Sequence, residues 1–247
     1  MQLSKNFNAL TATQMAEVDR LMVEEYHIEL AQMMENAGRH LATLAYSQLS
    51  VAGLATSDGN VVTILIGPGN NGGGGLTAAR YLSNWGVVVN TILMQPVEKL
   101  RSVPAIRWQT LLKLPVKTGA WHDPETTEMI GSSTLIIDAM LGYNQTGDPY
   151  GSIREAIPAI NQLSVPVLSL DIPSGLDATT GTPGEPCIQA NATLTLALPK
   201  TGLTNQSGKL YSGDLYLADI GVPPVLYTHL GLPAQNIFRD NPILKIG

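Results

Sequence analysis

The stretch that decides the fold is VVTILIGPGNNGGGGLTAARYL, which runs from Val61 to Leu82. It begins with a short apolar, β-branched run of the kind that forms a strand buried on both faces. Two asparagines and four consecutive glycines follow, and then a segment with apolar residues three and four positions apart, which is typical of a helix. A strand, a glycine-rich connection and a helix in this order predict the first unit of a doubly wound α/β sheet.

The rest of the chain repeats this alternation. Further strand-like runs are 87–94, 133–141, 166–172, 192–198 and 214–220, and the predicted crossover helices are 75–85, 98–113 and 151–162. Two amphipathic helices, 11–25 and 30–50, precede the first strand, and Thr11 with Gln14 forms a capping-box pattern. We therefore predict an α/β, Rossmann-like, doubly wound and mainly parallel sheet with helices on both faces and two leading N-terminal helices. Residues 1–247 form one domain, in which the proline-rich segment 222–247 is a C-terminal tail.

Composition excludes several classes of function. The net charge is −6 and the 14 basic residues form no run, which argues against a nucleic-acid surface. The single cysteine, Cys187, fits a reducing compartment, and the four histidines show no metal-ligand spacing, so we expect no zinc site. The N-terminus lacks a signal-peptide pattern and no stretch reaches the length of a membrane span. We expect a soluble, cytoplasmic protein.

The glycine stretch allows several interpretations. Gly67 to Gly72 matches the dinucleotide pattern G-x-G-x-x-G after a strand. The ribose-binding acid expected about 20 residues later is missing, which counts against a standard NAD dehydrogenase, and the Walker form fails because no Lys-Ser or Lys-Thr follows. A turn without a ligand is a third possibility, although four glycines are entropically costly for a plain turn. Asn70 and Asn71 bring amide oxygens suited to a cation or a ribose hydroxyl.

Polar residues stand at the ends of the later strands. Asp138 ends the third long run, Asp171 and Ser174 follow the fourth, and Lys200 follows the fifth. Each aspartate alone could be a turn former or a cap. Because the carboxyl ends of parallel strands meet at one sheet edge, all four are instead expected to share a site there. Ser174 lacks the G-x-S-x-G context of a nucleophile.

These segments together resemble the YjeF N-terminal domain family, the NAD(P)H-hydrate epimerases. The resemblance runs through about residues 10 to 221 and rests on LTATQMAEVDRLMVEEY, MMENAGR, GPGNNGGGGLTAARYL, IIDAMLG, LSLDIPSGLDATTG and LALPKTGL. It implies an isomerase that interconverts the R and S epimers of hydrated NADH or NADPH, so that a separate dehydratase can repair the cofactor. No dehydratase domain is expected within this chain.

The resemblance also implies residue roles. Asp171 would act on the hydrated nicotinamide, with Lys200 orienting it or binding phosphate. A potassium ion would be held by Asn71, Asp138 and Ser174, an oxygen-only set suited to a hard cation. The nucleotide-binding residues would be Asn70, Asn71, Gly72, Gly73, Gly74, Gly142, Tyr143, Asn144, Gln145, Thr146, Gly147 and Asp148.

The sequence departs from the family pattern at two positions. Gly74 stands where the family carries aspartate, and Tyr143 follows Gly142 where the family shows G-T-G. We hypothesise that Asp148 supplies the missing carboxylate. An active epimerase is the main interpretation. The alternatives are a nucleotide-binding relative with impaired or altered catalysis and a different enzyme, either hydride-transferring or hydrolytic.

The sequence leaves two further matters open. No basic residue is obviously placed for a 2′-phosphate, so the preference between hydrated NADH and hydrated NADPH stays open. The apolar residues of the leading helices are predicted to be core rather than a dimer surface, and a homodimer is expected by resemblance only. These residues are Met15, Leu21, Met22, Met33 and Met34.

Overall fold

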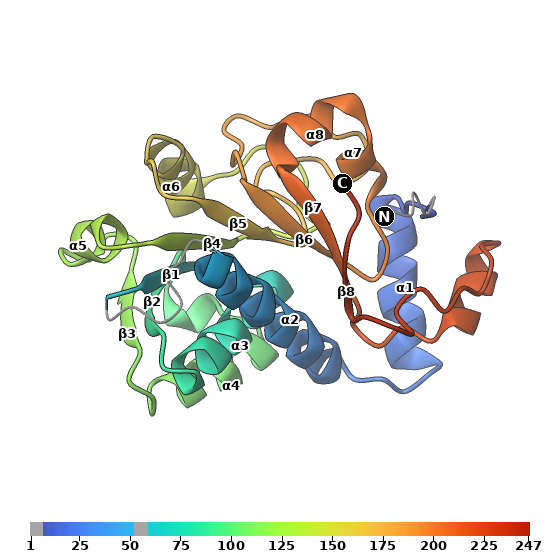
Figure 1. Ribbon diagram of the computed structural model, residues 1–247, viewed down its shortest axis with the longest axis horizontal. Helices are drawn as coiled ribbons and strands as arrows, with labels where there is room; N and C mark the ends of the chain where they lie inside the picture. The colour runs from blue at the N-terminus through green and yellow to red at the C-terminus, as the bar shows by residue number, and fades with distance from the viewer. Residues whose placement is uncertain (1–6, 52–58) are drawn as a thin grey trace.

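The sheet is the centre of the molecule. The structure is a computed structural model that describes residues 7–51 and 59–247. Over these residues one eight-stranded sheet has the order β3-β2-β1-β4-β5-β6-β7-β8, parallel throughout except for the antiparallel β7–β8 pair (Figure 1). The strands are β1 (Val61–Ile66), β2 (Val88–Leu93), β3 (Lys117–Ala120), β4 (Leu135–Ala139), β5 (Val167–Leu170), β6 (Ala192–Leu196), β7 (Asp214–Ala218) and β8 (Ile243–Lys245). The six predicted strands are confirmed, and the two edge strands β3 and β8 are additional.

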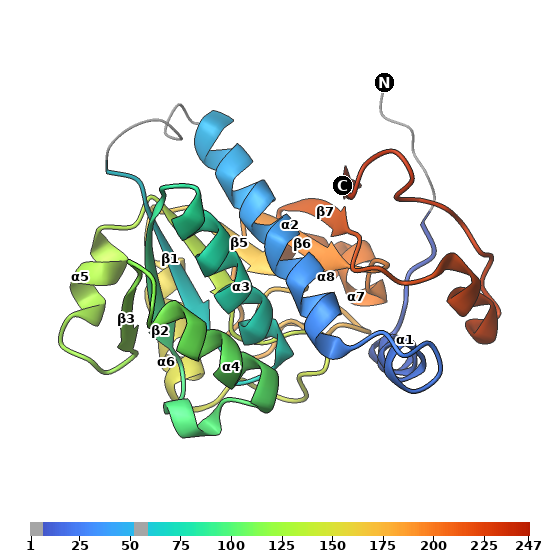
Figure 2. The ribbon, with the colours of Figure 1, turned by 90° about the horizontal axis from the view of Figure 1, so that it is seen from below.

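Helices cover both faces of the sheet. They are α1 (Ala12–Glu24), α2 (Leu30–Val51), α3 (Asn70–Asn84), α4 (Ser102–Leu111), α5 (Thr126–Gly131), α6 (Gly151–Asn161), α7 (Thr201–Thr204) and α8 (Gln206–Ser212), with 3₁₀ helices η1 (Val97–Lys99) and η2 (Pro224–Leu230). Figure 2 shows α2, α3 and α4 side by side on one face, and α6 lies on the other. The doubly wound α/β architecture is therefore confirmed. The capping box of Thr11 and Gln14 is also present at the start of α1.

Two apolar layers hold the sheet between these helices. Leu41, Leu76 and Ile64 belong to the cluster between the sheet and α2–α4, and each has no more than 1% of its surface exposed. Ile136 and Ile157 belong to the opposite cluster, which α5 and α6 cover. Each fully buried leucine or isoleucine stabilises the fold by roughly 2 kcal/mol through removal of apolar surface from water. The strands between these layers are apolar on both faces, as in other parallel sheets.

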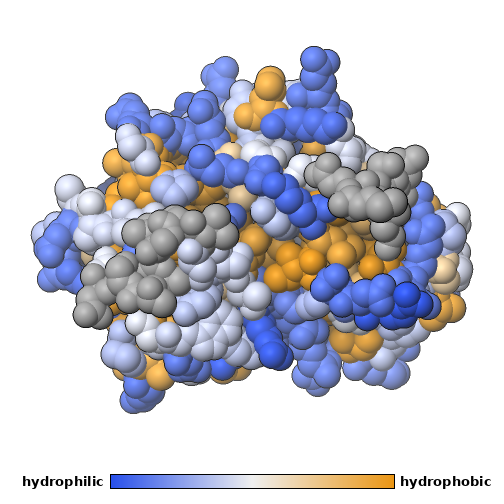
Figure 3. Space-filling model, viewed as in Figure 1, coloured by the Kyte–Doolittle hydropathy of each residue, from blue (hydrophilic) through white to orange (hydrophobic). Residues whose placement is uncertain are grey.

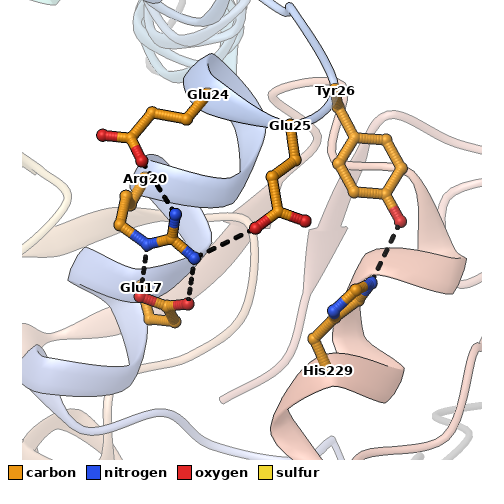
Figure 4. A network of polar contacts seen from close by, with 6 residues as sticks. All are labelled: Glu17, Arg20, Glu24, Glu25, Tyr26 and His229. Atoms are coloured by element: carbon orange, nitrogen blue, oxygen red, sulfur yellow. Dashed lines mark hydrogen bonds and ion pairs between the residues drawn. The ribbon is translucent and has the colours of Figure 1, made fainter.

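The C-terminal segment 222–247, expected as a tail, packs on the domain. This proline-rich stretch contains η2, which packs against α1, and β8, which extends the sheet beyond β7. Leu226 is fully buried there. In Figure 3 apolar side chains gather where α1 lies near this segment. Figure 4 shows Tyr26 next to His229 of η2. Beside them, the exposed side chain of Arg20 forms ion pairs with Glu17 and Glu24 of α1 and with Glu25, which caps this helix.

Helix α3 begins before the four glycines, at Asn70, and not after them. The glycines are needed because the helix packs closely on its surroundings. A Cβ on Gly72 would lie 1.9 Å from the carbonyl oxygen of Gly67, and one on Gly75 would lie 2.6 Å from Cβ of Ala139. At Gly74 the one close atom from the described residues is Leu170 Cδ2, the far end of a flexible side chain, at 2.7 Å. Among these glycines, position 74 is thus a place where a side chain fits at small cost.

Alanine substitutions should distinguish Gly72, which faces a backbone oxygen, from Gly74, which faces a flexible side chain. Gly72→Ala should destabilise the protein by about 3 kcal/mol or more, because a backbone oxygen cannot move away from the new methyl group without displacing β1 from α3. Gly74→Ala should stay within about 1 kcal/mol of the unaltered protein, since the helical preference of alanine offsets a small shift of Leu170. Urea unfolding of both variants measures the difference, and equal stability of the two would contradict this account of the close packing.

Candidate functional site

A cavity of about 260 Å³ lies at the carboxyl ends of the central parallel strands. Helices α1 and α2 close one side of it, and the loops after β1, β4, β5 and β6 form the rest. The predicted site residues that line it are Asn70, Asn71, Gly74, Gly142, Tyr143, Asn144, Gln145, Asp171 and Lys200. The strand-end positions expected from parallel topology therefore do meet in one place.

The cavity contains a buried ion pair between Asp171 and Lys200. Asp171 Oδ1 accepts from Lys200 Nζ, and the exposed fractions of the two residues are 3% and 0%. Lys200 Nζ also donates to the carbonyl oxygen of Leu196 at 2.9 Å. A buried charge is tolerated only when it is paired and hydrogen-bonded. Each of the two groups therefore fixes the position of the other.

The backbone at Asp171 directs its carboxylate into the cavity. The residue has φ of 67°, the left-handed conformation, which aspartate tolerates better than most residues but which still costs on the order of 1 kcal/mol. Its Oδ2 accepts from the backbone N–H of Tyr143 at 3.0 Å. The carboxylate is thus held from two sides at the end of β5, with one oxygen on a cation and the other on an amide. Such a group can accept a proton or stabilise a cation that forms next to it.

Asp138 and Ser174 lie beneath the cavity and not in its wall. Asp138 is fully buried on β4, and its carboxylate accepts from Ser174 Oγ at 2.6 Å, Ser174 N at 2.8 Å and Ser169 Oγ at 2.9 Å. Burial raises the pKa of Asp138, while the bonds from Ser174 oppose this. Among the residues that the structure describes, no cation forms an ion pair with Asp138.

Asn71 connects these groups to the cavity. Its amide nitrogen donates to the carbonyl oxygens of Leu141 at 2.8 Å and Leu170 at 3.2 Å. The N–H of Leu141 in turn donates to Ser174 Oγ at 2.9 Å. With its nitrogen used in this way, Asn71 has its amide oxygen left for a ligand. Asn71 and Ser174 are therefore linked through Leu141, and Ser174 also bonds the buried Asp138 carboxylate. Amide, hydroxyl and carboxylate oxygens are donors that fit a hard monovalent cation.

Asp148 does not take the place of a carboxylate at position 74. Its Oδ1 accepts from the backbone N–H of Glu185 at 3.0 Å, and it is not among the residues that line the cavity. The hypothesis that Asp148 supplies the missing carboxylate was wrong, because the loop after β4 turns toward the segment around Gly184 before it reaches this residue. The other predicted residues outside the cavity wall are Gly72, Gly73, Thr146 and Gly147.

Asp19 of α1 is a site residue that the sequence analysis missed. It lines the cavity and accepts a hydrogen bond of 2.6 Å from the hydroxyl of Tyr143 at its Oδ2. The signal was present in the sequence. Asp19 lies four residues after Met15 and three before Met22, both buried, so an acidic side chain interrupts the apolar stripe of an amphipathic helix.

Arg101 is a second residue that the sequence did not single out. It lines the cavity at the start of α4, where its N–H donates to the carbonyl oxygen of Pro68 at 3.0 Å. Within the described part of the chain its guanidinium makes no ion pair. Arg101 and Gly69, the N-cap of α3, both line this end of the cavity, where the unpaired backbone N–H groups of the helix start also favour an anion. A phosphate of a nucleotide would suit this end of the cavity.

The five apolar residues of the leading helices that were predicted to be core are buried. Met15, Leu21, Met22, Met33 and Met34 have 4% or less of their surface exposed, and three of them, Met15, Met33 and Met34, also line the cavity.

In the portion of the chain that the structure describes, no helix has both the length and the apolar character needed to cross a bilayer.

Comparisons with known proteins identify the family of the chain. The family described as "YjeF-related protein N-terminus" matches residues 30–202. The NAD(P)H-hydrate epimerase of Dehalogenimonas lykanthroporepellens is 40% identical over 90% of this chain and 86% of its own, and that of Pirellula staleyi is 34% identical over 85% and 90%. The bifunctional NAD(P)H-hydrate repair enzyme Nnr of Moorella thermoacetica is 35% identical over 88% of this chain and 41% of its own.

The fold has a solved counterpart. The crystal structure of the yeast protein ynu0 superposes with a TM-score of 0.83 at 22% sequence identity, covering 96% of this chain and 99% of that one. That structure shows the fold, and the family match over most of the chain, with the relative at 40% identity, shows that the chain belongs to the YjeF-related N-terminal domain family.

Proposed function

We propose that this protein is an NAD(P)H-hydrate epimerase, which interconverts the R and S epimers of hydrated NADH or NADPH. The observation that carries the proposal is the buried Asp171 carboxylate, held by Lys200 and by the Tyr143 N–H in the cavity at the strand ends. Several relatives over most of the chain bear this name.

The chemistry needs groups that move protons next to a ring that becomes cationic. Inverting the hydrated carbon breaks and remakes a bond at that carbon, and the ring nitrogen carries positive charge in between. A carboxylate at Asp171 stabilises such a cation by its charge and takes up a proton from incoming water. The apolar side chains of Met15, Met33 and Met34 keep bulk water away from the ring, which strengthens the electrostatic interaction.

The rim of the cavity suits the nucleotide part of the substrate. Asn70 at the start of α3 and Asn144 in the loop after β4 both line the cavity, and their amides can bind ribose hydroxyls. Arg101 and the start of α3 offer positive charge to the phosphates.

We propose that Asn71, Asp138 and Ser174 hold a potassium ion beneath the cavity. The ion would compensate the buried Asp138 carboxylate and fix the loop that carries Tyr143. Potassium chloride should then stabilise the unaltered protein against heat more than choline chloride at the same ionic strength. The expected gain is about 2 to 3 kcal/mol when potassium exceeds its dissociation constant about 100-fold.

Two serine variants test the potassium site by calorimetry. Ser174→Ala should lose this gain, whereas Ser152→Ala, outside the site, should keep it. Equal unfolding of the unaltered protein in the two salts would count against the site.

We propose a functional partnership with an NAD(P)H-hydrate dehydratase. The bifunctional Nnr relatives of Moorella thermoacetica and Salinibacter ruber match this chain over 41% of their own length and are named as repair enzymes. A homodimer stays a prediction from the resemblance, and a cytoplasmic location stays a prediction from the composition.

A coupled assay tests the proposed function. A dehydratase that accepts one epimer is given a mixture of both, and the recovery of NADPH absorbance is followed. With the dehydratase alone, the absorbance should rise rapidly until the accepted epimer is consumed. It should then rise only at the slow rate of spontaneous epimerisation. Adding this protein should remove the slow phase, whereas heat-unfolded protein should not. A slow phase that persists with folded protein argues against the function.

A further inference from the structure

The inference concerns Asp19, and it rests on the proposed function. Helix α1 carries Asp19 into the cavity wall, and its Oδ2 accepts from the Tyr143 hydroxyl at 2.6 Å. The chain has no carboxylate at position 74, and the geometry excludes Asp148 from the cavity. Asp19 is therefore a second carboxyl group in the cavity wall besides Asp171.

Tyr143 ties the two carboxyl groups together. Its backbone N–H donates to Asp171 at 3.0 Å, and its side-chain hydroxyl donates to Asp19. One residue thus fixes a carboxyl group on the α1 side of the cavity and another on the β5 side.

The charges around the two carboxyl groups differ. Lys200 forms its ion pair with Asp171 and none with Asp19. Burial raises the pKa of Asp19, the Tyr143 hydrogen bond and the Lys200 charge oppose this, and the Asp171 charge adds to it. Two carboxyl groups in one site whose environments differ are the usual basis for one acid and one base.

We propose that Asp19 is the second acid–base group of the site, working with Asp171 from the other side of the bound ring. The Asp19 carboxylic acid gives its proton to the hydroxyl on the hydrated ring carbon. The C–O bond breaks with its electron pair on oxygen, water leaves, and the ring nitrogen lone pair forms the C=N bond of a cation.

The second half of the step restores the hydrate with inverted configuration. Water adds to the opposite face of the same carbon, the C=N electron pair returns to nitrogen, and the proton released by the water goes to the Asp171 carboxylate. Solvent then moves a proton from Asp171 to Asp19, so no proton or electron is gained or lost overall. Conversion in the reverse direction uses the two groups in exchanged roles.

The charged and titratable groups around Asp19 are few. Tyr143 contacts it directly, and Asp171 and Lys200 act on it through the cavity. On η2, which packs against α1, His229 lies near Tyr26 and Glu17, and Tyr227 is buried in the apolar cluster with α1. One protonated and one ionised carboxyl group predict a bell-shaped pH dependence of kcat/KM. Its alkaline limb reports the pH above which neither group keeps a proton.

Asp19→Asn tests the proposal in the full chain. Asparagine keeps an oxygen for the Tyr143 hydroxyl, so the fold should be retained. Starting from either pure epimer, kcat should fall by about 100-fold or more while KM changes by less than about threefold, and the alkaline limb should disappear. The matched control is Glu17→Gln, on the exposed side of the same helix, which should keep the rate and the pH profile of the unaltered protein.

Tyr143→Phe provides a second test that leaves both carboxyl groups in place. It removes a hydrogen bond that stabilises ionised Asp19, so the alkaline limb should move to higher pH. If the unaltered protein converts the epimers and Asp19→Asn keeps its rate and pH profile, the role of Asp19 is overturned while the proposed function stands. If the unaltered protein converts neither epimer, the proposed function fails and this inference fails with it.

Discussion

Replacing Asp171 by asparagine should lower the rate of epimer interconversion by about 1000-fold. The change removes the negative charge that stabilises the cationic ring and the group that accepts a proton, and each of these effects is large in a site shielded from water. Asparagine also tolerates the left-handed backbone, which has φ of 67° at this residue, and still accepts from the Tyr143 N–H. The loss should therefore appear in kcat, measured by chromatography of the two epimers.

Two controls separate chemistry from folding in this experiment. Asp240→Asn changes an exposed carboxylate paired with Arg239 and should leave the rate unaltered. The double variant Asp171→Asn, Lys200→Met removes the unpaired lysine that the single change leaves buried, and it should be as inactive as the single variant. Activity of either Asp171 variant near that of the unaltered protein would rule out the carboxylate as the principal group.

Lys200→Met should destabilise the protein by about 3 to 5 kcal/mol. The substitution leaves the Asp171 carboxylate buried without its cation, and removing one partner of a buried pair costs this much because the remaining charge is not compensated. Methionine has nearly the volume and shape of lysine, so packing around the side chain changes little. Urea unfolding should show the loss as a lower midpoint.

The comparison variants make this result specific. Lys209→Met, on the exposed side of α8, should stay within about 0.5 kcal/mol of the unaltered protein. The double variant Asp171→Asn, Lys200→Met should recover part of the stability lost in Lys200→Met, since the unpaired charge is gone. If the Lys200→Met protein is as stable as the Lys209→Met protein, the charge of the buried Asp171 carboxylate does not depend on Lys200 for its compensation.

The central strands could be predicted from the sequence because they are apolar on both faces. The edges could not. β3 is the four-residue run Lys117–Ala120, which contains a lysine and a glycine, and β8 is the three-residue run Ile243–Lys245. Both depend on pairing with a neighbouring strand and not on a pattern of their own. The start of α3 was missed since four glycines disfavour a helix locally, and only close packing on β1, β4 and α2 makes them favourable there.

The site was predictable where topology alone determines it. Asp138, Asp171 and Lys200 end or follow parallel strands, and such ends must meet at one edge. Asp19 and Arg101 reach the cavity from α1 and from the start of α4, and no spacing within the sequence connects them to the strand ends. Asp138 and Ser174 lie below the cavity wall for local reasons. The alternation of side chains along β4 and the turn after β5 determine which groups face the cavity.

The most direct measurement for the account is the conversion of a single pure epimer by the unaltered protein. The purified R epimer of hydrated NADPH (R-NADPHX) is incubated with the protein in potassium buffer. The appearance of the S epimer (S-NADPHX) is followed by chromatography. The account predicts conversion at least about 100-fold faster than the spontaneous rate, reaching the same final ratio when the reaction starts from S-NADPHX. Conversion at the spontaneous rate from both epimers would contradict it.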